Sequence, residues 1–190
     1  MCHHRVVAGT IYTVGHSNVS AAEFFATIAG PGIRTLVDVR AFPASRRHAH
    51  FGREALAAGC RARGVAYEWM PALGGRRRAT TAVSAHTGWK VAAFRNYADY
   101  TDTPEFAAAL AQLEAIAARA PTAFMCAEAL WWRCHRRLIA DQLLLRGWEV
   151  LHVAAGGKPS PHRLPDFARV AEGRIIYDRG TTAPLELRDS

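Results

Sequence analysis

Short apolar, β-branched runs alternate along the chain with segments whose apolar residues recur at helical spacing. The runs predict strands over residues 10–15, 33–39, 65–70, 122–126 and 148–153. The helical segments cover residues 23–30, 53–64, 104–119 and about 131–146. Strands separated by helices imply right-handed crossovers and a mainly parallel sheet with both faces covered. The pattern therefore predicts an α/β fold: a single domain with a mostly parallel five-stranded sheet flanked by helices.

Local signals refine this organisation. Ser20 and Glu23 have the spacing of a capping box, and Thr103 followed by Pro104 marks a helix start. Residues 73–90 form a polar connection of unusual length, which is typical of a functional lid or of a disordered segment. Residues 1–153 are predicted to form the α/β domain. Residues 154–190 are predicted to be a loosely structured C-terminal tail packed on it, with room for one extra strand in GRIIYD.

Composition narrows the class of protein. Half of the 190 residues are apolar, which suits a folded domain, yet no apolar run approaches the ~20 residues that span a bilayer. The first residues lack the pattern of a secretory signal, and the four cysteines contain no C-x-x-C pair. We therefore expect a cytoplasmic protein in a reducing compartment, with no membrane partner.

The formal net charge of +8 is carried almost wholly by arginine, since all but two of the 24 basic residues are Arg. The planar guanidinium suits bidentate recognition of phosphate and carboxylate. A genome rich in G and C, which favours Arg and Ala codons, explains the same composition equally well. The net charge alone therefore does not identify the binding partner.

Segments with polar residues that could take part in catalysis or ligand binding follow the ends of all five predicted strands. They are Gly15–Asn18, Asp38 with Arg40, Leu73–Arg78, Cys126 with Glu128, and His152. The carboxyl ends of parallel strands meet at one edge of a sheet, which is where open α/β sheets bind ligands. This distribution predicts a single site at that edge.

Several of these segments, in the same order, resemble a known family. They are YTVGHSN, LVDVRAFPASRR, Phe51, LGG, MCAE, CHRRLIAD and VLHV, which together run from about residue 11 to 153. The pattern is similar to that of the family called domain of unknown function 488 (DUF488). The resemblance implies an uncharacterised protein with a Rossmann-like α/β fold, and it implies no settled activity.

An anion pocket is the leading interpretation of the site. We expect an enzyme that acts on a phosphate-bearing substrate, either a nucleotide or a nucleic acid. The candidates for catalysis are His16, Asp38, Cys126, Glu128 and His135, and those for substrate binding are Ser17, Arg40, Arg46, Gly74, Arg136 and His152. A helix terminus with Arg133 and Arg136 nearby is expected to lower the pKa of Cys126 and to make its thiol reactive.

Other interpretations remain open. Cys126 is equally consistent with a packed, inert thiol, and Asp38 with Arg40 is consistent with a structural ion pair. A non-catalytic protein that binds a nucleotide or nucleic acid uses the same pocket without chemistry. A metal-dependent enzyme is the third alternative, with ligands from Cys126, Glu128, Cys134 and His135. In one continuous helix, Cys126 and Cys134 would lie ~12 Å apart, so shared ligation requires a loop over residues 127–130. The cofactor and the oligomeric state stay unknown.

Overall fold

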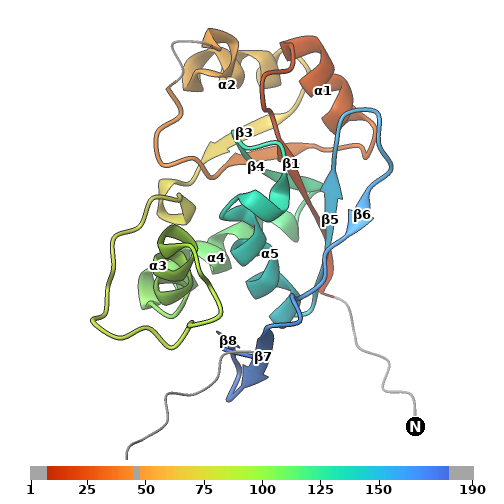
Figure 1. Cartoon of the computed structure of the whole chain (residues 1–190). Coiled ribbons are helices and arrows are strands. Elements are labelled where there is room, and N and C mark those ends of the chain that lie inside the picture. Colours follow the sequence, from red (N-terminus) through yellow and green to blue (C-terminus); the bar gives the residue numbers. More distant parts are fainter. Residues whose placement is uncertain (1–7, 45–47, 180–190) are drawn as a thin grey trace, which may run out of the picture.

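The computed structural model describes residues 8–44 and 48–179 and has a twisted central sheet between two layers of helices (Figure 1). The sheet order is β3-β2-β4-β1-β5-β6. The bounds are β1 Gly9–Gly15, β2 Thr35–Asp38, β3 Ala66–Trp69, β4 Thr122–Cys126, β5 Trp148–Val153 and β6 Ser160–Pro161. The first five strands pair in parallel and β6 pairs antiparallel with β5. The predicted α/β class is confirmed. The predicted strand number is too low by β6, because a two-residue strand leaves no periodic pattern.

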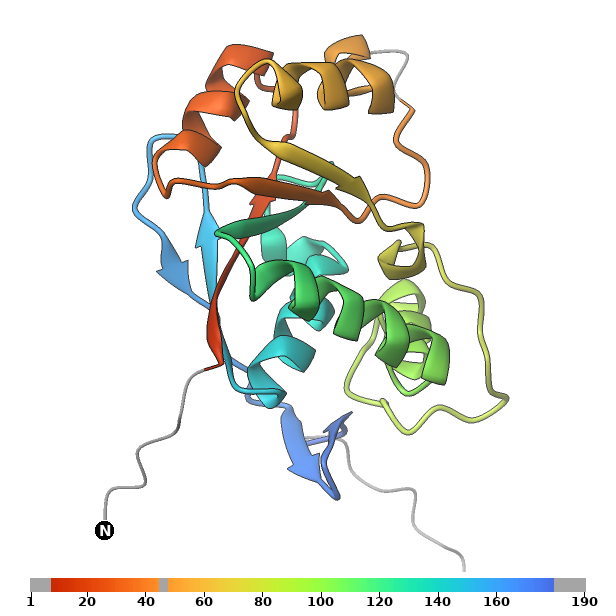
Figure 2. The same cartoon turned by 180° about the vertical axis from the view of Figure 1, so that it is seen from behind.

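Helices cover both faces of the sheet. Helices α1 (Ala21–Ala29) and α2 (Arg53–Arg61) lie on one face, and α3 (Ala92–Thr101), α4 (Pro104–Ala117) and α5 (Arg136–Leu145) lie on the other (Figures 1 and 2). The chain moves from β1 toward the β3 edge and then returns toward β5. Because crossovers keep one hand, the reversal of direction transfers the helices to the opposite face.

The core consists of two apolar layers separated by the sheet. Leu36 faces the layer of α1 and α2, whereas its neighbour Val37 faces the layer of α3, α4 and α5. Successive side chains of a strand point to opposite faces. A strand that is buried on both sides therefore reads as a continuous apolar run, as the predicted parallel strands do. Among the described residues, no helix combines the length and the apolar character that crossing a membrane requires.

The helix predicted over about 131–146 is two elements. A short 3-10 turn, η3 (Trp131–Arg133), is followed by α5, which begins only at Arg136. Cys134 separates them because its backbone is extended, with φ −124° and ψ 149°. The predicted start of this helix is therefore wrong by five residues, and the break has consequences for the site.

The connection over residues 73–90 begins at a 3-10 turn, η2 (Pro71–Leu73), and is anchored to the core near its end. His86 and Trp89 are buried. Nε2 of His86 donates to Asp102 at 3.3 Å, and Nδ1 accepts from the backbone N–H of Tyr177 at 3.4 Å. The connection leads into α3, which the sequence pattern above did not predict.

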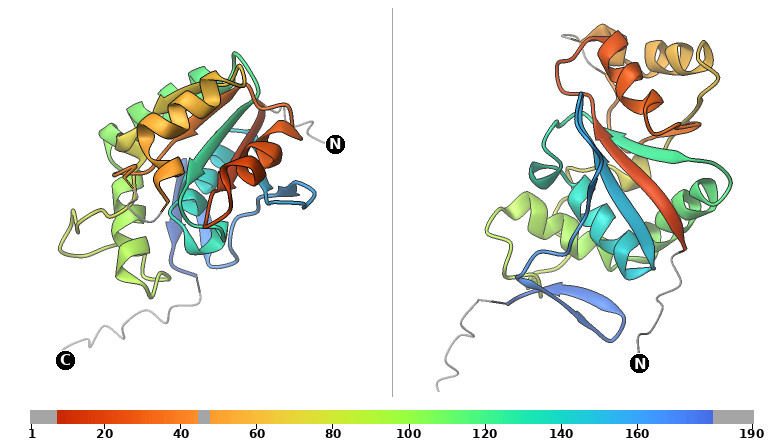
Figure 3. Two further views of the ribbon diagram at one scale, coloured as in Figure 1. Left: turned by 90° about the horizontal axis from the view of Figure 1, so that it is seen from above. Right: turned by 90° about the vertical axis from the view of Figure 1, so that its right-hand side faces the viewer.

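The C-terminal segment carries a hairpin of β7 (Ala168–Ala171) and β8 (Arg174–Tyr177), which lies beyond one end of α5 (Figures 1 and 3). Strand β8 is the extra strand expected in GRIIYD, while β7 was not predicted. Ile175 and Tyr177 are fully buried against the α5 layer. The hairpin therefore belongs to the main core.

Candidate functional site

A cleft of about 530 Å³ lies at the carboxyl edge of the sheet, where the ends of β2 and β4 meet the start of α5 and part of α3. Its lining includes Arg40, Phe42, Gly75, Arg76, Phe94, Tyr97, Cys126, Glu128, Arg133, Cys134 and His135. Of the residues predicted for the site, the cleft thus collects Arg40, Cys126, Glu128 and His135.

The loop after β4 folds back and brings Cys134 close to Cys126. The fully buried guanidinium of Arg136 holds this loop, donating to the backbone oxygens of Glu128 and Ala129 and to Thr13 Oγ1 at 2.9 Å. Gly15 makes room for it, since a Cβ there would lie 2.0 Å from the carbonyl oxygen of Glu128. The loop over 127–130 that shared ligation requires is therefore present.

His135 lies between the two cysteines and the end of β2. Its Nδ1 is 3.6 Å from Sγ of Cys134 and 3.9 Å from Sγ of Cys126, and its Nε2 is 3.2 Å from the carbonyl oxygen of Val39. A carbonyl oxygen only accepts hydrogen bonds, so Nε2 carries a hydrogen. In the neutral ring, Nδ1 therefore presents its lone pair to the thiols.

The two thiols have opposite pKa shifts. A hydrogen bond from Cys126 lowers the pKa of Cys134 well below its ordinary value, and His135 and Arg136 act in the same direction. The same hydrogen bond raises the pKa of Cys126, and burial raises it further. The lowered pKa expected for Cys126 thus falls on Cys134, because only the tertiary fold brings a second thiol to the strand end.

Asp38 and Arg40 form a buried ion pair behind the cleft. Nε and Nη2 of Arg40 donate to the two carboxylate oxygens at 2.8 and 2.6 Å, and the hydroxyl of Tyr67 donates to the same carboxylate at 2.7 Å. Nη1 of Arg40 lies 3.3 Å from Nε2 of His16. The structural ion pair considered from the sequence is therefore present, and most donors of Arg40 are used within the fold.

His16 is buried in this network and stacks on Phe51, with ring centroids 4.0 Å apart. Its Nδ1 donates to the carbonyl oxygen of Ser17 at 2.8 Å, which leaves Nε2 to accept from Arg40. Burial, with a contribution from Arg40, lowers the pKa of His16 to about 4. The imidazole is thus neutral near pH 7 and is sealed away from the cleft.

His152 belongs to a different cluster, on the α5 side of the sheet. Its Nε2 is 2.9 Å from Nδ1 of His162, whose Nε2 donates to Asp141 at 2.8 Å. The ring of Trp131 stacks on His152 at 4.0 Å. Burial and the nearby His162 and Arg136 lower the pKa of His152 to about 3. His152 therefore lies outside the cleft lining, although it is next to the last residue of β5.

The remaining residues predicted for the site either make local contacts or lie outside the residues that the structure describes. The hydroxyl of Ser17 contacts Asn18, and Ser17 has a positive φ of 47°. Gly74 is buried against Ala41, which lies only 2.8 Å from where a Cβ would sit. Arg136 is used as described above. Arg46 lies outside the residues that the structure describes.

Helix α3 supplies residues that the sequence pattern missed. Tyr97 is buried against the ring of His135, with centroids 5.2 Å apart, and its hydroxyl donates to the carbonyl oxygen of Leu73 at 2.7 Å. The signal was present, because Phe94, Tyr97, Ala98 and Thr101 have the i, i+3, i+4, i+7 spacing of a helix face. Arg76, from the predicted loop, lines the cleft as well.

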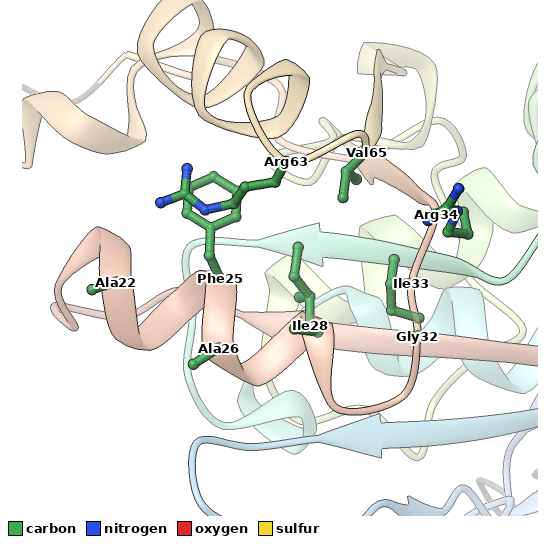
Figure 4. Close-up of a pocket in the computed structure, with 10 residues that line it drawn as sticks. Ala22, Phe25, Ala26, Ile28, Gly32, Ile33, Arg34, Arg63 and Val65 are labelled. Atoms are coloured by element: carbon green, nitrogen blue, oxygen red, sulfur yellow. The ribbon is translucent and has the colours of Figure 1, made fainter.

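A second cavity, of about 520 Å³, lies at the opposite edge of the sheet between α1 and the starts of β2 and β3 (Figure 4). Its walls are mainly apolar, with Phe25, Ile28 and Val65. The guanidinium of Arg63 stacks over Phe25 at 4.1 Å. None of the predicted catalytic residues lines it. The chemistry of the molecule is concentrated at the other edge.

Comparison with known proteins identifies one family. The family model described as "Domain of unknown function DUF488" matches residues 20–143. Neither a search of curated proteins nor a search of solved structures found a match to the chain.

Proposed function

Since the chain belongs to the domain of unknown function 488 family, whose description names no activity, we propose a function from the cleft itself. The protein is an enzyme that acts on a phosphate-bearing substrate, a nucleotide or a nucleic acid, bound at the carboxyl edge of the sheet. The observation that carries this proposal is the meeting of free arginines and reactive side chains in one cleft.

Arg76 and Arg133 are the phosphate-binding residues in this proposal. Both are exposed, both line the cleft, and within the described part of the chain neither has an ion-pair partner. Arg40 and Arg136, the arginines favoured from the sequence, are buried and use most of their donors for hydrogen bonds within the fold. Charge-assisted hydrogen bonds from guanidinium to phosphate are strong and directional, so two free arginines suit a phosphate group.

Aromatic side chains in the same cleft favour a nucleotide over a simple phosphate ester. Phe42 is 74% exposed, and Phe94 also lines the cleft. A base that stacks on an aromatic ring contributes roughly 1–3 kcal/mol to binding. The rings and the guanidinium groups line the same cleft of about 530 Å³, so one nucleotide could place its base on a ring and its phosphate on the arginines.

Glu128 is the acid–base residue of the proposed reaction. Its side chain is exposed in the cleft, whereas Asp38 and His16 are buried behind Arg40. General acid–base catalysis requires a group within hydrogen-bonding reach of the substrate. Asp38 and His16 instead hold Arg40 in place at the base of the cleft.

Binding and turnover measurements test this proposal. Nucleoside mono-, di- and triphosphates and short single-stranded oligonucleotides are titrated by fluorescence anisotropy, and products are followed by chromatography. Arg76→Ala and Arg133→Ala should each weaken binding about tenfold, the effect of losing one charge-assisted contact. For an oligonucleotide, the slope of log affinity against log salt should fall by about 0.7 per lost contact.

Arg119→Ala is the matched control, because Arg119 is exposed at the far end of α4, toward the opposite edge of the sheet. Equal losses in all three arginine variants, or no loss in any, would refute a phosphate site in the cleft. Glu128→Gln should retain binding and lose turnover. Binding without any product would favour the alternative function, a non-catalytic nucleotide or nucleic-acid binding protein.

A further inference from the structure

Three potential metal ligands converge at the base of the cleft. The thiols of Cys126 and Cys134 and a ring nitrogen of His135 all lie within 4.8 Å of one another. We propose that these three side chains bind a zinc ion, with Nδ1 of His135 as the nitrogen ligand and the fourth position of the metal open to the cleft. The evidence for this metal site is the arrangement of the three side chains and of the groups that hold them, and only a role for the ion in turnover rests on the proposed function.

The distances between the ligands fit a tetrahedral ion. Zinc bonds of about 2.3 Å to sulfur and 2.0–2.1 Å to nitrogen place a sulfur and a nitrogen ligand roughly 3.6 Å apart. The observed separations from Nδ1 of His135 are 3.6 Å to Cys134 and 3.9 Å to Cys126. Shifts of a few tenths of an ångström would therefore bring both sulfur–nitrogen pairs to the ideal separation. The two sulfurs lie within 4.8 Å of each other, against roughly 3.8 Å for a tetrahedral zinc ion.

The hydrogen bond behind His135 is the second independent observation. Metal-bound histidines donate their other ring N–H to a carbonyl or carboxylate, which fixes the tautomer and the ring orientation. Nε2 of His135 donates to the carbonyl oxygen of Val39 at 3.2 Å. The lone pair of Nδ1 is therefore directed at the thiols before any ion binds.

The fold holds the two cysteines together although seven residues separate them in the chain. Arg136 fixes the loop over 127–130, and the extended backbone of Cys134 turns its side chain back toward Cys126. Burying the guanidinium of Arg136 has a large desolvation cost, which simple packing of two small cysteine side chains would not require. The same buried arginine does hold the two cysteines and His135 in position to bind a metal ion.

The ligand set identifies the ion and the kind of site. Two thiolates and one imidazole in a tetrahedral arrangement suit zinc. Structural zinc sites have four protein ligands, whereas catalytic sites have three and leave a position for water or substrate. Glu128 lines the same cleft but lies outside the three-residue cluster. It is thus available to exchange a proton with a water or substrate bound at the open position.

Metal analysis of untagged protein purified without chelators tests this inference. We expect elemental mass spectrometry to find about one zinc ion per chain. After chelation, cobalt(II) should restore the thiolate charge-transfer band in the ultraviolet and the visible bands of a tetrahedral ion. Cys126→Ser, Cys134→Ser and His135→Asn should each weaken zinc binding by tenfold or more, whereas Cys60→Ala, on α2, should leave it unchanged.

A second variant guards against loss of folding in the cysteine variants. Gly75→Ala keeps all three ligands but places a methyl group 2.9 Å from Nδ1 of His135, so zinc binding should weaken while circular dichroism stays unchanged. Wild-type protein that takes up neither zinc nor cobalt would overturn the inference. So would a disulfide between Cys126 and Cys134 in freshly purified protein, which lowers the intact mass by two hydrogens.

The two proposals fail separately. Zinc bound at this cluster by a protein that binds no nucleotide would refute the proposed function and leave the metal site standing. Nucleotide turnover by protein that is free of zinc and resists reconstitution would do the reverse.

Discussion

At the scale of single residues, the floor of the cleft depends on a pair of charges removed from water. Asp38 is fully buried and Arg40 nearly so. The carboxylate oxygens of Asp38 accept from the guanidinium and backbone N–H of Arg40 and from the hydroxyl of Tyr67. The ring of His16 accepts from Arg40 on its other side. Removal of either partner leaves the other charge buried and unpaired, which costs more than the pair itself contributes.

We therefore predict that Asp38→Ala lowers the free energy of unfolding by roughly 3–5 kcal/mol, measured by urea denaturation. The control is Asp178→Ala, because the pair of Asp178 with Arg169 lies at the surface. That variant should lose far less stability, since exposed ion pairs contribute little. A similar loss in both variants would contradict the structural role given to Asp38.

At the scale of elements, Tyr177 connects the hairpin of β7 and β8 to α5 through a side-chain hydrogen bond as well as through burial. Tyr177 is fully buried, and its hydroxyl donates to Asp141 of α5 at 2.7 Å. Its backbone N–H donates to His86, so the same residue also anchors the long connection before α3. Three segments far apart in the sequence therefore share this contact.

Tyr177→Ala should lower the free energy of unfolding by about 3–5 kcal/mol, as expected for removal of a buried aromatic ring. Val170→Ala on the paired strand is the control, because Val170 is 52% exposed and should change stability little. Limited proteolysis should also cleave residues 154–179 faster in the tyrosine variant. Equal stability of the two variants would mean that the hairpin is not docked as described.

At the scale of the whole molecule, buried neutral histidines make the fold sensitive to acid. Burial lowers the pKa of His152 to about 3, against 6.5 for a free histidine. In the unfolded chain, His152 binds a proton as the pH falls through 6.5, but in the folded protein it does not. The stability that depends on neutral His152 is complete above pH 6.5 and is lost as the pH falls below it.

We predict that the free energy of unfolding falls as the pH is lowered from 6.5 to 4, and that His152→Gln makes this slope shallower. The difference should reach at most about 1.4 kcal/mol per pH unit. Glutamine does not titrate, and its amide can still donate to His162 in place of Nε2. His50→Gln, at an exposed position, should keep the wild-type slope. Identical slopes for wild type and His152→Gln would contradict the prediction.

Much of the fold could be predicted from the sequence because its signals are local. The five parallel strands follow from apolar runs. The capping box of Ser20 and Glu23 and the Thr103–Pro104 pair mark two helix starts that the structure confirms. Parallel pairing then places the strand ends at one edge, so Arg40, Cys126 and Glu128 could be assigned to a common cleft, and His135 follows from its place near the start of the next helix. The same reasoning also assigned His16, Asp38 and His152 to the cleft, and these three do not line it. These inferences need only the periodicity of strands and helices and the handedness of their crossovers.

Tertiary structure decided the direction and the partners of those side chains. The cleft lies at the ends of β2 and β4, whereas His152 lies on β5, on the far side of β1, where Trp131 and His162 enclose it. Arg136 looked like a phosphate ligand from its position, yet it folds inward because the carbonyl oxygens of the 127–130 loop need donors. The approach of Cys134 to Cys126 depends on that inward turn. Contacts of this kind join residues through space and leave no periodic trace in the sequence, so only the folded chain could determine them.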